Sequence, residues 1–202
     1  MVFLLPTNGA QSRVILMAVL LGLALPLSPV QILWVNLVTA VTLSLTLAGE
    51  PAEPGIVQRP PRSPKEQVLS GRMIVLVIIA SLLIGGVTLA VFLSERNLGA
   101  THAQVQTAAV TMLALAQPAF LFNARFLNSS SLTPRVLTGN RAIWIGAGIL
   151  LVLQIAFVYA PFMNAWFDSA PIGLRGWGIS LGLAILVFLL TRAGKALVRR
   201  RV

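Results

Sequence analysis

The chain has 202 residues, of which 57% are hydrophobic and 10% are charged, and its formal net charge is +10. Soluble domains average about 25% charged residues, and a water-soluble fold of this size could not bury so much apolar surface, so an integral membrane protein is predicted. The chain contains no cysteine, which excludes disulfides, thiolate metal sites and cysteine nucleophiles.

Apolar stretches long enough for membrane-spanning helices occur along the whole chain, since a bilayer core takes about 20 residues of helix. In chain order they cover residues 2–25, 29–48, 73–93, 105–122, 142–159 and 177–190. Pro26 and Pro29 separate the first two, because proline opposes helix continuation. The predicted fold class is all-α: a polytopic membrane protein with one bundle of six transmembrane helices, forming a single domain over residues 1–202.

Basic residues are distributed unequally between the two sides of this arrangement. The connectors after the second and fourth spans and the C-terminal segment hold most of them, whereas the opposite connectors hold only Arg96 and Arg175. Cytoplasmic connectors carry an excess of Lys and Arg, so both termini and the Pro-rich loop 49–72 are predicted to be cytoplasmic, in a plasma (inner) membrane. No basic face is interleaved with aromatic residues, so the lipid bilayer is expected as a partner and nucleic acid is not.

Polar side chains inside apolar spans are costly and usually face another helix or an ion path. Three of the predicted spans carry such residues: Asn8 and Gln11 in the first, Asn36 and Thr39 in the second, and Gln117, just before Pro118, in the fourth. Amide and hydroxyl oxygens, with carbonyls freed near proline and glycine, suit hard cations. The alternative is that these residues join helices through hydrogen bonds, and spacing alone leaves both interpretations open.

Longer segments resemble a known family. The chain reads "LPLSPVQILWVNLVTAVTLSLTLAGEPAEP" from residue 25, followed by "RPPRSPKEQVLSG", and this is similar to the sixth transmembrane helix and following loop of type-II P-type cation-transporting ATPases. Bacterial members, which are relatives of the calcium and sodium-potassium pumps, are the most similar in sequence. "FLLPTNGAQ" resembles their fifth helix and "LFNARFL" the end of their eighth. The resemblance implies that the six spans are helices five to ten of such a pump.

The resemblance also implies roles for the polar residues. Asn8 and Gln11 fall at cation ligands of the fifth helix, Asn36 and Thr39 at those of an unwound sixth helix, and Gln117 at one of the eighth. In calcium pumps the positions of Gln11, Ala40 and Gln117 are acidic. Neutral dipoles repay the lost hydration of a divalent ion poorly, so weak binding of a monovalent or other cation is expected and no specific metal site.

Arg13 adds a positive charge within the first span, two residues beyond Gln11. It is expected to snorkel or to pair with backbone carbonyls. The alternative is that it acts as a tethered cation that fills the site. A guanidinium directed at Asn36 and Thr39 would favour the second interpretation, and one directed elsewhere would favour the first.

The catalytic parts of such a pump are missing from the sequence. The phosphorylation motif Asp-Lys-Thr-Gly-Thr does not occur, and nothing resembles a nucleotide-binding domain. No catalytic residue is therefore assigned. No cofactor is assigned either, since ATP and Mg would bind to the missing domains. The chain is therefore expected to be inactive alone, as a fragment or split subunit whose partner chain carries the catalytic domains. The alternatives are a non-catalytic, pump-derived binding or regulatory protein, and an unrelated permease, which should show an internal repeat.

Overall fold

The computed structural model describes residues 4–44, 46, 71–124 and 141–200, and the regular structure in these residues is helical. The elements are α1 (Leu4–Leu20), α2 (Pro29–Thr39), a π-helix η1 (Ala40–Ser44), α4 (Gly71–Asn97), α5 (His102–Ala124), α7 (Arg141–Tyr159), α8 (Pro161–Phe167) and α9 (Leu174–Arg200). The predicted all-α class is confirmed. The loop 49–72 lies outside the described residues, apart from its last two.

Helices occupy each of the predicted spans, but they differ in length. Among the described residues, α4, α5, α7 and α9 are long and apolar enough to cross a membrane, whereas α1 and α2 are shorter. The count of six spans therefore stays a prediction. Two elements were not predicted: the π-helix that continues α2, and the short helix α8, which begins at Pro161.

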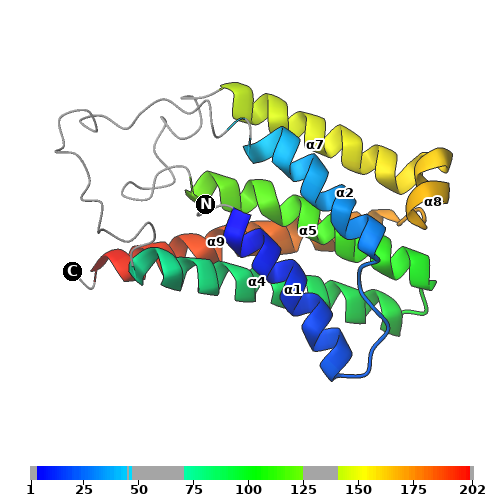
Figure 1. The fold of residues 1–202 in the computed structure, drawn as a ribbon, viewed down its shortest axis with the longest axis horizontal. Coiled ribbons are helices and arrows are strands. Elements are labelled where there is room, and N and C mark those ends of the chain that lie inside the picture. The colour runs from blue at the N-terminus through cyan, green and yellow to red at the C-terminus, as the bar shows by residue number, and fades with distance from the viewer. Residues whose placement is uncertain (1–3, 45, 47–70, 125–140, 201–202) are drawn as a thin grey trace.

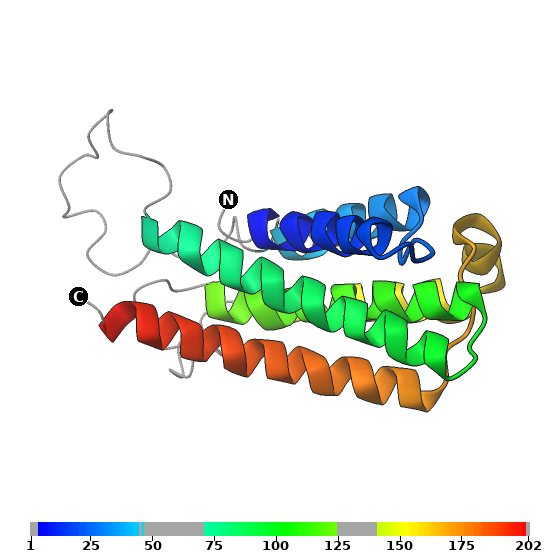
Figure 2. The same cartoon turned by 90° about the horizontal axis from the view of Figure 1, so that it is seen from below.

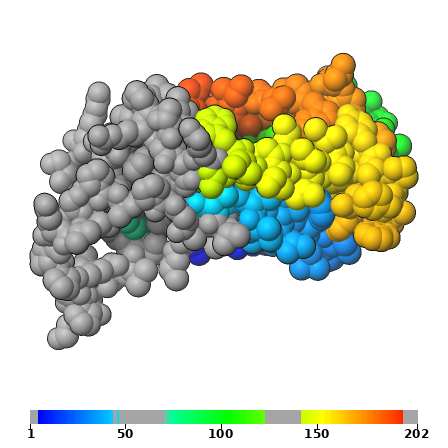
Figure 3. Space-filling model, turned by 90° about the horizontal axis from the view of Figure 1, so that it is seen from above, coloured from blue at the N-terminus to red at the C-terminus, as the bar shows by residue number. Residues whose placement is uncertain are grey.

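The helices run alternately in opposite directions (Figure 1). On the left of the view, α1, α4 and α7 begin and η1, α5 and α9 end. Turned by 90°, α1 and α2 form an upper layer over α4, α5 and α9 (Figure 2). The face shown in Figure 3 has α7 beside the segment formed by α2 and η1, which agrees with the contacts between these elements.

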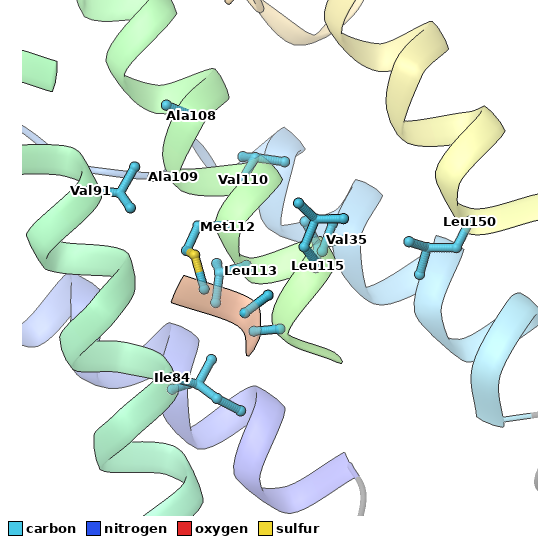
Figure 4. Packing of buried hydrophobic residues seen from close by; sticks show 14 of the residues in the cluster. Val35, Ile84, Val91, Ala108, Ala109, Val110, Met112, Leu113, Leu115 and Leu150 are labelled. Atoms are coloured by element: carbon cyan, nitrogen blue, oxygen red, sulfur yellow. The ribbon is translucent and has the colours of Figure 1, made fainter. Parts of the chain in front are cut away.

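Helix α5 lies at the centre of the bundle. Of its apolar window, 83% is buried inside the protein, against 28–33% for α4, α7 and α9. Figure 4 shows its side chains Val110, Met112 and Leu115 between Ile84 of α4 and Leu150 of α7. The surrounding helices expose large aliphatic side chains on their outer faces, as expected for helices whose solvent is lipid.

One end of the bundle, on the right of Figure 1, is held by polar contacts between side chains and backbone groups. Gln31 of α2 donates to the carbonyl of Phe167 at 3.0 Å, and Thr107 of α5 accepts from the amide of Ala170 at 2.9 Å. The ring of Trp34 stacks on Phe157 with centroids 5.7 Å apart. These contacts connect α2 to the α8 region and α5 to the segment before α9, and so fix where α2 enters the bundle.

Candidate functional site

The start of α2 is set by its own sequence. Pro29 occupies the first turn, where its missing N–H costs nothing, and Ser28 is the N-cap. The Ser28 hydroxyl accepts from the Gln31 amide at 3.3 Å, while the Gln31 side chain accepts from the Ser28 amide at 3.1 Å. This reciprocal capping box fixes the beginning of the helix and therefore the direction in which Asn36 projects two turns later.

Two of the predicted site residues meet across helices. Gln11 of α1 donates from Nε2 to Oδ1 of Asn36 on α2 at 3.0 Å, although the residues are 25 positions apart. Gln11 is buried and Asn36 half-buried. The contact is a partly buried pair of uncharged amides between two apolar helices, which is compatible with both interpretations of these residues.

Thr39 is buried but turns its hydroxyl to its own helix. It donates to the carbonyl of Val35 at 2.6 Å and contacts that of Asn36 at 3.3 Å. Thr42 donates to the carbonyl of Val38 at 2.7 Å in the same way. The resemblance implied an unwound helix here, but the structure has a π-helix from Ala40, so the backbone hydrogen bonding is shifted and not lost. Such π segments are frequent at functional sites.

A glycine of α7 allows that helix to pack closely against the π-helix. A Cβ at Gly146 would overlap the carbonyl oxygen of Thr42 and would lie 2.9 Å from the methyl carbon of Thr46. Only a residue without a side chain lets the two backbones approach this closely. The position of η1, directly after Asn36 and Thr39, therefore depends on Gly146.

The other two predicted ligands are placed differently. Asn8 is exposed on α1. Gln117 of α5 is 1% exposed, and neither its amide nitrogen nor its amide oxygen has a hydrogen-bond partner in the described part of the chain. Pro118, inside the same helix, has no N–H to offer the carbonyl one turn earlier, that of Ala114. The structure thus brings Gln11 and Asn36 together and leaves the Gln117 amide without a partner among the residues it describes. The role of the set as cation ligands stays a prediction.

Arg13 is directed at a different helix. Its Nη1 donates to the backbone carbonyl of Ile78 on α4 at 3.3 Å. This is the carbonyl pairing that the sequence suggested, and it lies on α4, not at Asn36 or Thr39. Among the described residues the carboxylates are Glu95, near the end of α4, and Asp168, at the end of α8.

Sequence reasoning missed one amide in the interior, that of Gln154. Gln154 of α7 is buried and donates to the hydroxyl of Thr111 on α5 at 3.0 Å, and that hydroxyl donates to the carbonyl of Thr107 at 2.8 Å. A signal was present, because Gln154 is an isolated amide in an otherwise apolar span. Because this amide nitrogen has a partner, Gln154 joins α7 to α5 as a structural link.

A double-mutant cycle tests the coupling between the two amides. We expect Gln11→Ala and Asn36→Ala to destabilise the chain less in combination than the sum of their separate effects. The coupling free energy should be about 0.6 kcal/mol and at most about 1.7 kcal/mol, the range measured for hydrogen bonds between membrane helices. Unfolding of the purified chain in mixed detergent and SDS measures it. Strictly additive effects would show that the hydrogen bond contributes nothing.

Comparison with known proteins identifies the family to which this chain is similar. The family described as "Cation transporting ATPase, C-terminus" matches residues 24–197. The chain is 38% identical over 173 residues to "Probable cation-transporting ATPase F" of Mycobacterium tuberculosis, which covers 86% of this chain and 19% of that protein. It is 34% identical over 202 residues to "Calcium-transporting ATPase" of Bacillus subtilis, covering 98% of this chain and 22% of the relative.

A third relative agrees with these two. "Cation-transporting ATPase pma1" of Synechocystis is 32% identical over 184 residues, which cover 89% of this chain and 20% of that protein. The chain therefore spans about a fifth of the length of the curated relatives that it matches. The match extends over the helices that carry Asn36, Gln117 and Gln154. This multi-pass membrane chain belongs to the family of the C-terminal membrane region of P-type cation-transporting ATPases.

Proposed function

We propose that this chain forms the cation pathway of a P-type cation pump whose catalytic domains are supplied by polypeptide outside this sequence. The observation that carries the proposal is the hydrogen bond of 3.0 Å between Gln11 and Asn36, which joins two apolar helices directly before a π-helix. The family match supports it, and so does the share of about a fifth of each relative that the chain covers.

In this proposal the amides are the ligands of a loosely held ion. Without an ion, Gln11 and Asn36 satisfy each other, and Thr39 and Thr42 satisfy carbonyls of their own helix. When a cation enters, these hydrogen bonds would break, and the amide and hydroxyl oxygens would bind the cation instead. The Gln117 amide, which has no partner among the described residues, needs no bond to be broken first. Movement of α1 against α2, driven by phosphorylation of the catalytic domains, would separate the pair and alternate the access to the site.

The lack of nearby acidic side chains among the described residues supports a proposal about the class of ion. The described acids, Glu95 and Asp168, lie at helix ends and not beside Gln11 or Asn36, and the described residues contain no group of three His, Cys, Asp or Glu that could hold a metal ion. Calcium and magnesium are normally held with the help of carboxylates. We therefore propose a monovalent cation as the transported ion. The excess of basic residues in the connectors predicted to be cytoplasmic supports a location in the plasma membrane, with both ends of this chain on the cytoplasmic side.

A chimaera tests the proposal. The segment of the Bacillus subtilis relative that aligns with this chain is replaced by the chain itself, so that the relative supplies the catalytic domains. We expect phosphorylation of the chimaera by ATP to respond to an alkali cation and not to micromolar calcium. The combined variant Gln11→Glu, Ala40→Asp and Gln117→Glu should raise the apparent affinity for calcium by at least about tenfold, because it adds carboxylates.

The control variant is Gln104→Glu, which adds one negative charge at the beginning of α5, away from the amide pair, where the combined variant adds three. It should leave the cation response unchanged. A chimaera that is monodisperse and binds ATP, but whose phosphorylation ignores every alkali cation and calcium, would contradict the proposal. That result would instead fit a pump-derived membrane protein without a transport role.

A further inference from the structure

A groove of about 360 Å³ lies between α1 and α4. It is formed where the two helices cross, close to the points at which Gly85 meets the backbone of Ala10 and Gly9 meets Ser81. Its walls include Arg13, Leu16 and Met17 of α1 and Ser81, Leu82 and Gly86 of α4. Because Leu16, Met17 and Leu82 are exposed, the groove opens to the outside of the bundle, where the solvent of a membrane protein is lipid.

Arg13 is the one charged residue in the wall, and it is not neutralised within the described residues. Its Nη1 donates to the carbonyl of Ile78, which is also the normal acceptor for the backbone amide one turn later in α4. The carboxylate of Glu95 is 17 residues further along the same helix, a distance of about 25 Å. A charge in a membrane span is costly and normally has a partner, so the structure leaves a place for an anion.

The wall of the groove is almost wholly apolar, and its few polar groups come from Arg13 and Ser81. Arg13 and Ser81 precede the other wall residues Leu16, Met17 and Leu89, which follow in the direction in which both helices continue. The beginnings of α1 and α4 lie on the same side of the bundle, the side predicted to be cytoplasmic (Figure 1). A bilayer lipid of that leaflet has the same order, with a headgroup at the surface and an acyl chain pointing inward.

We propose that the groove binds an anionic phospholipid of the cytoplasmic leaflet, with its phosphate at the Arg13 guanidinium and one acyl chain along the walls formed by Met17, Leu82 and Leu89. Ile78 lies seven residues, about 10 Å, inside the beginning of α4. The headgroup is therefore drawn below the plane of its neighbours, which is the local thinning that charges in spans induce. The proposal concerns the lipid alone and does not depend on the ion pathway.

Native mass spectrometry of the purified full-length chain tests the lipid. The chain is released from micelles that contain equal amounts of phosphatidylglycerol and phosphatidylcholine. We expect one bound phosphatidylglycerol, retained at least roughly fivefold over phosphatidylcholine, as the attraction of one basic residue for an anionic lipid gives. Arg13→Gln should abolish the preference and Arg13→Lys should keep most of it. Arg96→Gln, at the exposed far end of α4, is the matched control and should change nothing.

A second measurement keeps Arg13 intact. The chain has no cysteine, so a fluorophore can be placed on Leu89→Cys in the groove or on Ile185→Cys on the exposed face of α9. Phosphatidylglycerol brominated on its acyl chains should quench the groove position more strongly, and brominated phosphatidylcholine should quench both positions equally. The proposal would be overturned if brominated phosphatidylglycerol and brominated phosphatidylcholine quenched the groove position equally. It would also be overturned if the Arg13→Gln chain kept its preference for phosphatidylglycerol. The second result is the one expected if a carboxylate on another protein helix is the partner of Arg13.

Discussion

Replacement of Gln117 by leucine is expected to stabilise the chain and to remove the cation response that we propose for the chimaera. Both polar atoms of the amide are buried and have no hydrogen-bond partner among the described residues. An unsatisfied buried polar group costs about 1–3 kcal/mol, and leucine fills a similar volume without that cost. The free energy of unfolding in mixed detergent and SDS should therefore rise by about that amount.

Gln154→Leu is the matched control for Gln117→Leu. Both residues are buried glutamines in apolar helices, but Gln154 donates to the Thr111 hydroxyl at 3.0 Å. Its replacement removes a made hydrogen bond, so the chain should lose about 0.5–1.5 kcal/mol of stability. Opposite signs for the two variants would separate an amide kept for function from one that supports the fold. A loss of stability on Gln117→Leu as large as that on Gln154→Leu would contradict this.

In the chimaera described above, the same Gln117→Leu variant should no longer change its phosphorylation in response to an alkali cation. A residue that weakens the fold is retained only where it serves another purpose, and functional sites are the usual places for such residues. A more stable chimaera with an unchanged cation response would remove Gln117 from the proposed ligand set. It would leave the pair of Gln11 and Asn36 untested, because that pair lies on other helices.

Gly146→Ala is expected to have the second large effect. The added methyl group would overlap the carbonyl oxygen of Thr42 in η1, and a backbone atom cannot rotate away as the end of a side chain can. Adding a group to a well-packed interior typically lowers the free energy of unfolding by about 1–3 kcal/mol. We expect that loss in stability, together with a weaker cation response in the chimaera, because a displaced η1 moves Asn36 and Thr39.

Gly148→Ala is the control on the same helix. Gly148 is exposed, and an added Cβ would meet nothing within 4 Å. Because alanine favours helix over glycine by up to about 1 kcal/mol, this variant should be neutral or slightly stabilising. Thermal unfolding of the two variants in one detergent compares them directly. Equal melting temperatures for both would show that η1 does not depend on the close approach at Gly146.

The sequence by itself determined the all-α class and the places where several helices begin. Composition excluded a soluble fold, and Ser28, Pro29 and Gln31 specified the start of α2 through contacts within four residues of one another. Such local signals can be read from a chain because they involve no distant partner. The resemblance to cation pumps rested on long continuous stretches for the same reason, and the family match bears it out.

Only the tertiary structure decided which polar groups meet. Gln11 and Asn36 are 25 residues apart, Gln154 and Thr111 are 43 apart, and Arg13 reaches a carbonyl 65 residues away. Helical periodicity gives the face on which a side chain lies but not the helix that faces it. In a membrane the difficulty is greater, because lipid-facing and core-facing residues are equally apolar: on α4, Leu82 is exposed and Ile84 is buried. Sequence therefore identified the polar residues, and the packing of the helices determined their partners.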